Sequence, residues 1–422
     1  MPMKKTTLVL SLFLVFLFAA TQFVAKTTAQ VWENTRYIVS TVKTGDSGYA
    51  ILVINNYPMG SFERNYSLVK VDALGRQEWN QTYMLYGSSH LSSLVYTSDE
   101  GYALAGGRDF STYGEQYSLN GRGIDFWLVK TDKFGNIEWD RTYGGSRHDS
   151  ASSIVETSDG GYALAGYTWS YGEGLWLVKT DSNGTLQWQQ QYTGDLIKGI
   201  VQTEDNGFAF ITNIPCVLIK TNNDGTVEWN ISVESNSQPN LILRTSDNGY
   251  AILCNVFTGY FQTLYCSLTK VDMNGNILWK QNYTSCHFNS FAKVSSGGFV
   301  LAGSFIDANT TLYGLVKTNA AGNLIWDEGL GNYIGSVSSV IGTSDGGFFV
   351  VGTSNGSVWV AKTDSSGNVP ISSPEPTPTT EPKSTPYEEP QQTEQDMTVG
   401  AIFAVTTIAV FLGLLFYFIK RR

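Results

Sequence analysis

Few residues of this 422-residue chain have types that could support catalysis or metal binding: three histidines, four cysteines and one serine in a Gly-x-Ser-x-Gly segment. That segment, Gly352–Gly356, has the spacing of a serine nucleophile elbow. The elbow joins a strand to a helix, whereas strand-like residues lie on both sides of this segment. His90, His148 and His287 lack the paired His and Cys spacing of a zinc site. We therefore identify no catalytic residue and no metal site, and we expect no cofactor.

A second group of residues has types that suit recognition of a glycan or a protein, because it combines aromatic, arginine and acidic side chains. Ten of the eleven tryptophans occupy positions of the repeat described below, and Trp169 is the exception. The structural alternative is that these aromatic side chains pack a long loop onto the fold. The candidate ligand-binding residues are Arg108, Asp109, Tyr113, Tyr117, Arg122, Arg147, His148, Trp169, Tyr171 and Glu173.

A sequence repeat must position these residues. One copy contains Thr157-Ser158-Asp159-Gly160-Gly161-Tyr162, then Trp-Leu-Val-Lys-Thr-Asp at 176–181, and then Trp188. Each copy has four short segments bounded by Gly, Asp, Asn and Ser, which is typical of strands joined by tight turns. Four antiparallel strands in roughly 40 to 50 residues form one blade of a β-propeller. The repeated lysine occurs seven times, at Lys70, Lys130, Lys179, Lys220, Lys270, Lys317 and Lys362.

The seventh copy is incomplete, because Lys362 is followed by Asp364, Gly367 and then Pro370, without the tryptophan of a fourth strand. The segment Gln30–Glu33 contains Trp32 and precedes the first blade. We expect it to pair with the third strand of blade seven, which would close the ring and remove an exposed edge. The predicted fold class is an all-β, seven-bladed β-propeller over residues 30–369, closed by an N-terminal strand. The other copies have the tryptophan at Trp79, Trp139, Trp188, Trp229, Trp279 and Trp326.

The two rims of such a ring differ in this sequence. Turns between first and second strands, and between third and fourth strands, are nearly identical in the copies. We call that side the uniform rim. The other connections vary in length and form the variable rim, which holds the candidate binding residues. Repeat proteins place insertions on the binding face. Because the chain leaves blade seven at the uniform rim, we expect the variable rim to face away from the cell.

The two ends of the chain predict export and anchoring. Residues 1–29 combine two early lysines, an apolar run and small residues before a cleavage point, as in a signal peptide. Residues 370–396 are rich in Pro, Thr and Glu and predict a disordered stalk. Residues 397–419 carry no charge and are long enough for a transmembrane helix, and the basic residues 420–422 predict a cytoplasmic tail. The predicted location is the cell membrane, with a single pass and the propeller extracellular.

The formal net charge of −10 argues against a nucleic-acid partner.

The cysteines and the sequons agree with an exported protein. Cys254 and Cys266 are expected to lie opposite one another on adjacent strands, and we predict a disulfide between them, with Cys216 and Cys286 buried as free thiols. Seven sequons are candidate glycosylation sites, at Asn65, Asn80, Asn183, Asn230, Asn282, Asn309 and Asn355.

The repeat resembles those of secreted or cell-surface archaeal and bacterial β-propeller proteins, as the segments Thr97–Gly145 and Thr157–Trp188 show best. Its Asp-x-x-Gly-x-x-x-Trp core is also similar to the tryptophan-docking motif of quinoprotein blades, which bind pyrroloquinoline quinone (PQQ). The adjacent cysteine pair of that family is absent, and its eight blades do not match seven copies. The turn Thr157–Gly161 is similar to the Asp-box turn of sialidases, where it has a structural role.

Two interpretations of function follow. The favoured one is a membrane-anchored extracellular propeller that serves as a binding, adhesion or scaffold module for a glycan or a surface protein. The alternative is an exported enzyme, either a glycan-active hydrolase or lyase or a quinoprotein-like oxidoreductase. The long stalk and the lack of a paired-carboxylate signature favour the first.

Overall fold

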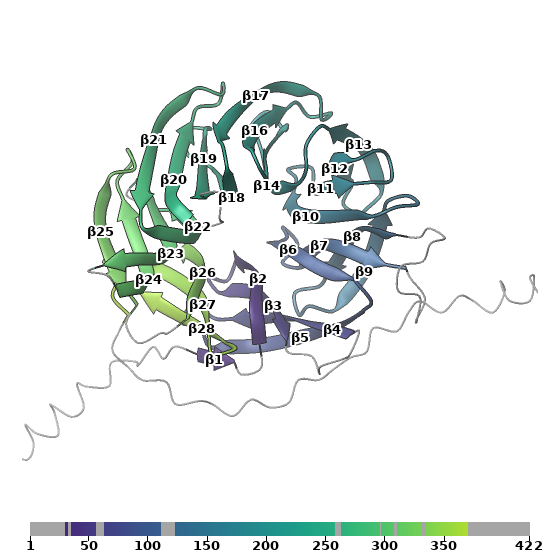
Figure 1. Ribbon diagram of the computed structural model, residues 1–422. Coiled ribbons are helices and arrows are strands. Elements are labelled where there is room, and N and C mark those ends of the chain that lie inside the picture. Colours follow the sequence, from purple (N-terminus) through teal and green to yellow (C-terminus); the bar gives the residue numbers. More distant parts are fainter. Residues whose placement is uncertain are drawn as a thin grey trace, which may run out of the picture. The chain divides into compact units, whose positions relative to one another are not determined.

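The computed structural model describes residues 30–32, 35–55, 63–110, 123–257, 263–295, 297–307, 310–330 and 335–369. Its strands, β1 to β28, form seven four-stranded antiparallel sheets. The sheets are arranged around a central axis as the blades of a propeller (Figure 1). This confirms the predicted all-β, seven-bladed architecture.

The first strand of each blade lies nearest the axis and the fourth lies outermost (Figure 1). Blade one consists of β2 (Thr35–Lys43), β3 (Tyr49–Asn55), β4 (Glu63–Val71) and β5 (Gln77–Tyr86); blade two of β6 (His90–Tyr96), β7 (Tyr102–Asp109), β8 (Ile124–Thr131) and β9 (Ile137–Tyr143); and blade three of β10 (Asp149–Glu156), β11 (Tyr162–Thr168), β12 (Gly174–Thr180) and β13 (Leu186–Tyr192). Blade four consists of β14 (Ile197–Gln202), β15 (Phe208–Thr212), β16 (Cys216–Thr221) and β17 (Val227–Glu234); and blade five of β18 (Ser237–Arg244), β19 (Tyr250–Phe257), β20 (Thr263–Val271) and β21 (Ile277–Thr284). Blade six consists of β22 (Cys286–Lys293), β23 (Phe299–Asp307), β24 (Thr310–Thr318) and β25 (Leu324–Gly329); and blade seven of β26 (Ser336–Gly342), β27 (Phe348–Ser354), β28 (Ser357–Thr363) and β1 (Gln30–Trp32).

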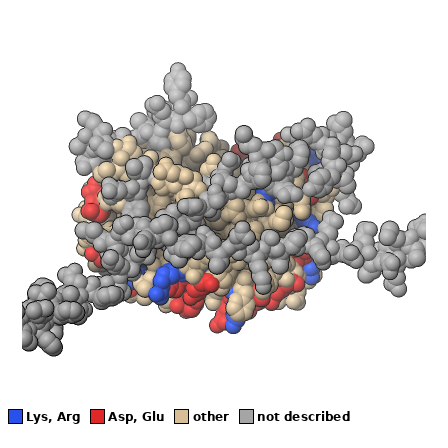
Figure 2. All heavy atoms as spheres, turned by 90° about the horizontal axis from the view of Figure 1, so that it is seen from below, with Lys and Arg blue, Asp and Glu red and all other residues tan. Residues whose placement is uncertain are grey.

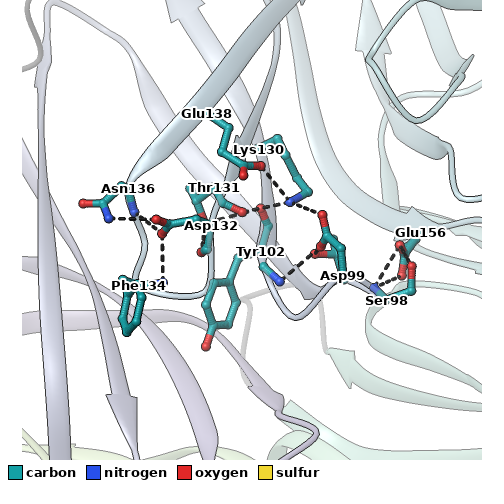
Figure 3. A network of polar contacts seen from close by, with 12 residues as sticks. Ser98, Asp99, Tyr102, Lys130, Thr131, Asp132, Phe134, Asn136, Glu138 and Glu156 are labelled. Atoms are coloured by element: carbon teal, nitrogen blue, oxygen red, sulfur yellow. Dashed lines mark hydrogen bonds and ion pairs between the residues drawn. The ribbon is translucent and has the colours of Figure 1, made fainter.

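The repeated lysine has a structural role at the uniform rim (Figure 3). In blade two the Lys130 ammonium lies 2.7 Å from Asp99 Oδ2 and 3.1 Å from Glu138 Oε2, and it donates to the Thr131 carbonyl at 2.9 Å. These three acceptors satisfy a side chain that is only 4% exposed. Because Asp99 lies in the first turn and Glu138 in the fourth strand, the lysine fastens one end of the blade.

Charged side chains gather along one edge of the propeller in the side view (Figure 2). The carboxylates that pair with the repeated lysines lie at the uniform rim and are about half exposed. Examples are Asp46, Asp159 and Asp205. The acidic character of this rim therefore follows from the repeat itself. Such regularity marks a scaffold rather than a unique site.

Neighbouring blades meet through the same aromatic contact at six junctions. The fourth-strand tryptophan of each of blades one to six packs edge-on against the aromatic residue that begins the second strand of the next blade. The ring centroids lie 5.8 to 6.1 Å apart. At four of these junctions a tyrosine hydroxyl also donates to a turn glycine of the next blade, as Tyr143 does to the Gly184 carbonyl at 2.6 Å. The repeated tryptophan therefore joins successive blades.

The ring is closed by the N-terminal strand, as predicted, because β1 pairs antiparallel with β28. The register differs from the expected one. Trp32 lies opposite Val358, whereas the tryptophans of the other blades lie opposite the repeated lysine, as Trp139 does opposite Lys130. Trp32 therefore occupies the position of the tyrosine four residues further along, the equivalent of Tyr143. Matching tryptophan to tryptophan in the sequence gave the right partner strand and the wrong alignment.

The predicted disulfide between Cys254 and Cys266 is corrected by the strand register. Cys254 lies opposite Ser267, and Cys266 lies opposite Asn255. Because neighbouring residues of a strand point to opposite faces of a sheet, the two thiols lie on opposite sides of blade five. Cys254 belongs to the core between blades four and five, and Cys266 to the core between blades five and six. All four cysteines are buried free thiols in the structure.

Several predictions concern residues outside the described part of the chain. These are the signal peptide (1–29), the stalk (370–396), the transmembrane helix (397–419), the tail (420–422) and the sequon at Asn309. Within the described ranges no helix is long and apolar enough to cross a membrane. Of the remaining sequons, Asn65 and Asn80 are partly buried, and the exposed ones are Asn183, Asn230, Asn282 and Asn355.

Candidate functional site

Two connections of the variable rim lie side by side at blade three. One joins β9 to β10 and carries Arg147 and His148, and the other joins β11 to β12 and carries Trp169 and Tyr171. The Trp169 amide donates to the His148 carbonyl at 2.9 Å, and the Tyr171 hydroxyl donates to the Gly144 carbonyl at 2.9 Å. Residues that are distant in sequence are thereby held as one surface.

A buried carboxylate fixes this arrangement. Asp149 is fully buried and accepts a hydrogen bond from the Thr168 hydroxyl. It also accepts from the Trp169 amide at 3.1 Å and from the Ser170 amide and hydroxyl at 3.2 and 2.5 Å. A fifth donor is the Gly145 amide at 3.1 Å. A buried carboxylate with this many donors is well satisfied, so Asp149 makes both loops rigid.

The outer part of this surface is aromatic. The rings of His148, Tyr167 and Trp169 lie 5.5 to 6.0 Å apart, centroid to centroid. The Trp169 side chain is 45% exposed and Tyr171 is 48% exposed. We call these four residues, together with the exposed Arg147 and Glu173, the aromatic loop surface.

The electrostatics of the surface are mild. Burial lowers the pKa of His148, although Asp149 and Asp109 act in the opposite direction. Burial raises the pKa of Tyr167 and of Tyr171. At neutral pH the side chains of His148, Tyr167 and Tyr171 are therefore uncharged. The charge at the surface comes from Arg147 and Glu173. An uncharged aromatic area with both charge signs at its border suits non-covalent binding rather than proton transfer.

Sequence reasoning missed two members of this site. Neither Asp149 nor Tyr167 is among the candidate residues that the sequence indicated. Tyr167 follows the glycine of the second strand, where blade two has Gly107. A bulky ring at that repeat position was the available signal. Nothing in the local sequence of Asp149 indicates five donors, because four of them come from other segments.

Two of the predicted ligand-binding residues, Arg108 and Asp109, form contacts within blade two and with its neighbouring connection. Arg108 forms an ion pair with Asp140, which also accepts from Trp127 Nε1 at 2.8 Å. Its guanidinium carbon lies 5.6 Å from the centroids of the Phe110 and Trp127 rings. Asp109 accepts from the Ser88 amide at 2.8 Å, across the adjoining connection. Tyr113, Tyr117 and Arg122 lie outside the described residues.

The serine of the Gly-x-Ser-x-Gly segment and the remaining histidines lie in strands and their connections. The Gly352–Gly356 segment spans the end of β27 and its connection to β28, so strands lie on both sides of Ser354. His90 Nε2 lies 2.8 Å from Ser150 Oγ, and burial lowers the pKa of His90 and of His287. Among the residues that the structure describes, no group of three or more His, Cys, Asp or Glu could hold a metal ion.

A cavity of about 540 Å³ lies on the opposite, uniform rim, where blades five, six and seven meet. The first turn of blade six borders it, and the sequence there has Ser296 where the other blades have the lysine-binding aspartate. Lys317 of this blade donates instead to the Ser365 carbonyl of blade seven at 3.2 Å. The cavity is thus associated with an irregular copy of the repeat and is distant from the aromatic loop surface. Its lining includes Lys270, Lys293, Phe299, Ala320, Thr343 and Phe348.

Comparison of the chain with known proteins supports the fold. The sequence matches no family model and no curated protein. The structure is similar to the WD40 β-propeller domain of Doa1, with a TM-score of 0.53 and 16% identity over 81% of this chain and 98% of that one. It is also similar to U3-55K, with a TM-score of 0.53 and 12% identity over 79% and 98%. A third match is RRP9 WD40 repeats, with a TM-score of 0.52 and 12% identity over 80% and 97%. Identities this low establish the propeller fold alone.

Proposed function

We propose that this chain is a membrane-anchored, extracellular propeller that binds a partner protein through the aromatic loop surface. The observation that carries the proposal is the pair of variable-rim loops held rigid by Asp149, with Trp169 and Tyr171 about half exposed. Rigid, exposed aromatic side chains lose little conformational entropy on binding, so they contribute much of their buried area to affinity.

The fold class supports a binding role. A seven-bladed β-propeller commonly serves as a protein-binding or scaffold module. Here the frame is the repeated part of the chain, and the loops that depart from the repeat carry Trp169 and Tyr171. This division of roles is what a scaffold with a grafted binding site requires.

The composition of the surface favours a protein over a glycan as partner. Tryptophan, tyrosine and arginine are the residue types that contribute most to protein interfaces, and Arg147, Trp169 and Tyr171 supply one of each. Glu173 adds an acidic group at the border, so the partner should present an apolar centre with charges of both signs around it.

The anchoring part of the proposal rests on the sequence predictions for residues 1–29 and 370–422. The side of the ring on which such an anchor would lie is inferred from the last described residues, 364–369, which follow β28 at the uniform rim. A chain that leaves there would place the anchor on one side of the ring and the aromatic loop surface on the other. The partner would then be extracellular.

A binding experiment with a matched control tests the proposal. The full chain, displayed on cells, is used to capture surface proteins from neighbouring cells by cross-linking. Captured partners are measured against a Trp169→Ala/Tyr171→Ala variant. The control is Phe134→Ala/Met273→Ala, which removes two side chains of similar exposure from the uniform rim. We expect affinity to fall roughly tenfold or more for the first variant only.

Other outcomes would redirect or reject the proposal. Equal binding by both variants would reject the aromatic loop surface as the site. A glycan array on which the parent chain binds a defined sugar, with loss in the Trp169 variant, would keep the site and change the partner class. Turnover of a sugar or an alcohol would favour the exported-enzyme alternative instead.

A further inference from the structure

The four cysteines form two pairs, and each pair spans a junction between neighbouring blades. Cys216 lies on the third strand of blade four and Cys254 on the second strand of blade five. The Cys254 thiol donates to Cys216 Sγ, and the two sulfur atoms are 3.5 Å apart. Both residues are fully buried, at 0% exposure.

The second pair spans the next junction around the ring. Cys266 lies on the third strand of blade five and Cys286 begins the first strand of blade six. Both belong to the core between these blades, and the Cys286 thiol interacts with that of Cys266. The Cys266 thiol donates to Asn255 Oδ1 at 3.0 Å, and the Cys286 thiol donates to the Tyr283 carbonyl at 3.1 Å. Burial, followed by the interaction with Cys286, raises the pKa of Cys266. The hydrogen bond from Cys254, followed by burial, raises the pKa of Cys216. In their reduced form the thiols of Cys216 and Cys266 are therefore neutral in the folded protein.

We propose that Cys216–Cys254 and Cys266–Cys286 are oxidised to two disulfide bridges that join blades four, five and six. A disulfide needs a sulfur separation of about 2.05 Å, so the first pair must approach by about 1.5 Å, which rotation of the two side chains and a small shift of the facing sheets can supply. Bridges between the facing sheets of a β-sandwich have this same arrangement.

The alternative pairings are disfavoured by position. Cys254 and Cys266 point to opposite faces of blade five, so a bridge between them would require a one-residue shift of the β19–β20 register. A metal site is a second alternative, and no group of three or more potential ligands is found among the described residues. Two separate pairs are thus the arrangement that the positions of the four thiols favour.

The chemistry is thiol–disulfide exchange with an external disulfide as oxidant. The thiolate of one cysteine attacks the oxidant and releases one thiol, which leaves a mixed disulfide on the chain. The second thiolate then attacks the chain sulfur and releases the other thiol. Two cysteine thiols and one external disulfide thus give one bridge and two external thiols. Because the thiols are buried once the blades have packed, the oxidant must react during folding, before junctions four–five and five–six close.

The bridges would strengthen the part of the ring opposite its closure. Blades four to six would be joined covalently, whereas blades seven and one are joined by the pairing of β1 with β28. Cross-links between residues 216 and 254 and between 266 and 286 restrict the unfolded chain and thereby stabilise the folded one. The inference is independent of the proposed binding surface, which lies at blades two and three.

Peptide mapping tests the proposal. The full chain is sent to an oxidising compartment behind a leader that the host exports, with a co-exported disulfide protein as an indicator of oxidation. Cells are lysed into an alkylating reagent without reductant, and the purified chain is digested and analysed by mass spectrometry. We expect cross-linked peptides that contain 216–254 and 266–286, and an intact mass lower by four hydrogen atoms than after reduction.

Two alanine variants assign the pairs. Cys216→Ala should lose the 216–254 peptide, leave Cys254 alkylated and retain the 266–286 peptide. Cys286→Ala should give the converse result. Alkylation of all four cysteines while the indicator protein is oxidised would overturn the proposal, as would a peptide that joins Cys254 to Cys266. Either result is obtained from denatured peptides, so a variant that folds poorly still gives an answer when compared with the parent chain.

Discussion

The junction that closes the ring differs from the six junctions between consecutive blades. At the six, a tryptophan packs edge-on against the next blade, as Trp139 does against Tyr162 at 6.1 Å. At the closing junction, Tyr49 of blade one stacks face to face on Phe349 of blade seven, with centroids 3.7 Å apart and planes inclined by 7°. The turn glycine Gly75 faces Val360 there instead of a tryptophan ring.

The lysine contact of the closing blade is weaker than that of blade two. Lys362 pairs with Asp345 alone in the described part of the chain, and its side chain is 22% exposed. Lys130 has two carboxylate partners and is 4% exposed. The acidic partner in the fourth strand is lost because that strand is β1, which does not belong to the repeat. The repeated residues therefore form six junctions, and the seventh is built from different residues.

Removal of β1 should have the largest effect on this comparison. Deletion of residues 30–32 from the full chain leaves the β28 edge unpaired beside Val358, Trp359 and Val360, which are at most 1% exposed. We expect destabilisation on the order of 5 kcal/mol and aggregation through the open edge. Thermal unfolding and light scattering measure both effects.

The matched control separates backbone from side chain. Replacement of residues 30–32 by three threonines retains the backbone and a high strand propensity. It should lose far less stability than the deletion, because β1 does not supply the tryptophan of the repeat position. A deletion variant that melts within a degree of the parent would show that β1 is not the closure.

The alignment of β1 illustrates what the sequence could and could not predict. Blade number and strand order follow from the spacing of Lys362 and its equivalents, because local turns set the register of each hairpin. No turn connects β1 to β28, so their register depends on the packing of the whole ring. The sequence offered only Trp32 as a guide, and the match to Trp326 and its equivalents misplaced it by four residues.

The candidate site shows the same limit. Arg147, His148, Trp169 and Tyr171 could be assigned to neighbouring loops because the strand order places their connections on one rim. The hydrogen bonds that hold the loops together could not be predicted, since they depend on the position of the Asp149 carboxylate. The sequence indicated Arg108 as a binding residue in the same way, but its guanidinium forms an ion pair with Asp140 on the fourth strand of the same blade.

A substitution at each kind of junction gives the second largest effect. Phe349→Ala removes a fully buried ring from the closing junction, and Trp139→Ala removes a partly buried ring from a repeat junction. We expect losses of about 3–5 kcal/mol for Phe349→Ala and roughly 2–4 kcal/mol for Trp139→Ala. Denaturant unfolding measures both. A larger loss for Trp139→Ala would mean that the repeat junctions, not the closure, are the sensitive ones.

A smaller effect should come from the tyrosine hydroxyl that bonds to the next blade at four of the repeat junctions. Tyr143→Phe removes the donor to the Gly184 carbonyl, a bond of 2.6 Å, without changing the packed ring. We expect a loss of about 1 kcal/mol in the free energy of unfolding, the usual value for one hydrogen bond. Tyr37→Phe is the control, because Tyr37 is 63% exposed. Equal losses for the two variants would show that the junction bond contributes no stability of its own.

The smallest expected effect is the pH dependence of the closing blade. Lys362, followed by the Thr343 hydroxyl, lowers the pKa of Asp345 to about 2. Because the folded-state pKa lies below the unfolded value of about 3.9, this pair stabilises the fold above pH 4 and loses its contribution as the pH falls towards 2. The same applies to Asp46, Asp159 and Asp247, which also have a pKa of about 2. Asp345→Asn should therefore reduce the acid sensitivity of the melting temperature slightly, and Asp159→Asn should reduce it by a similar amount, because the two pKa values are lowered alike. A clearly smaller change for Asp345→Asn would show that the closing blade's lysine contact contributes less than that of a repeat blade.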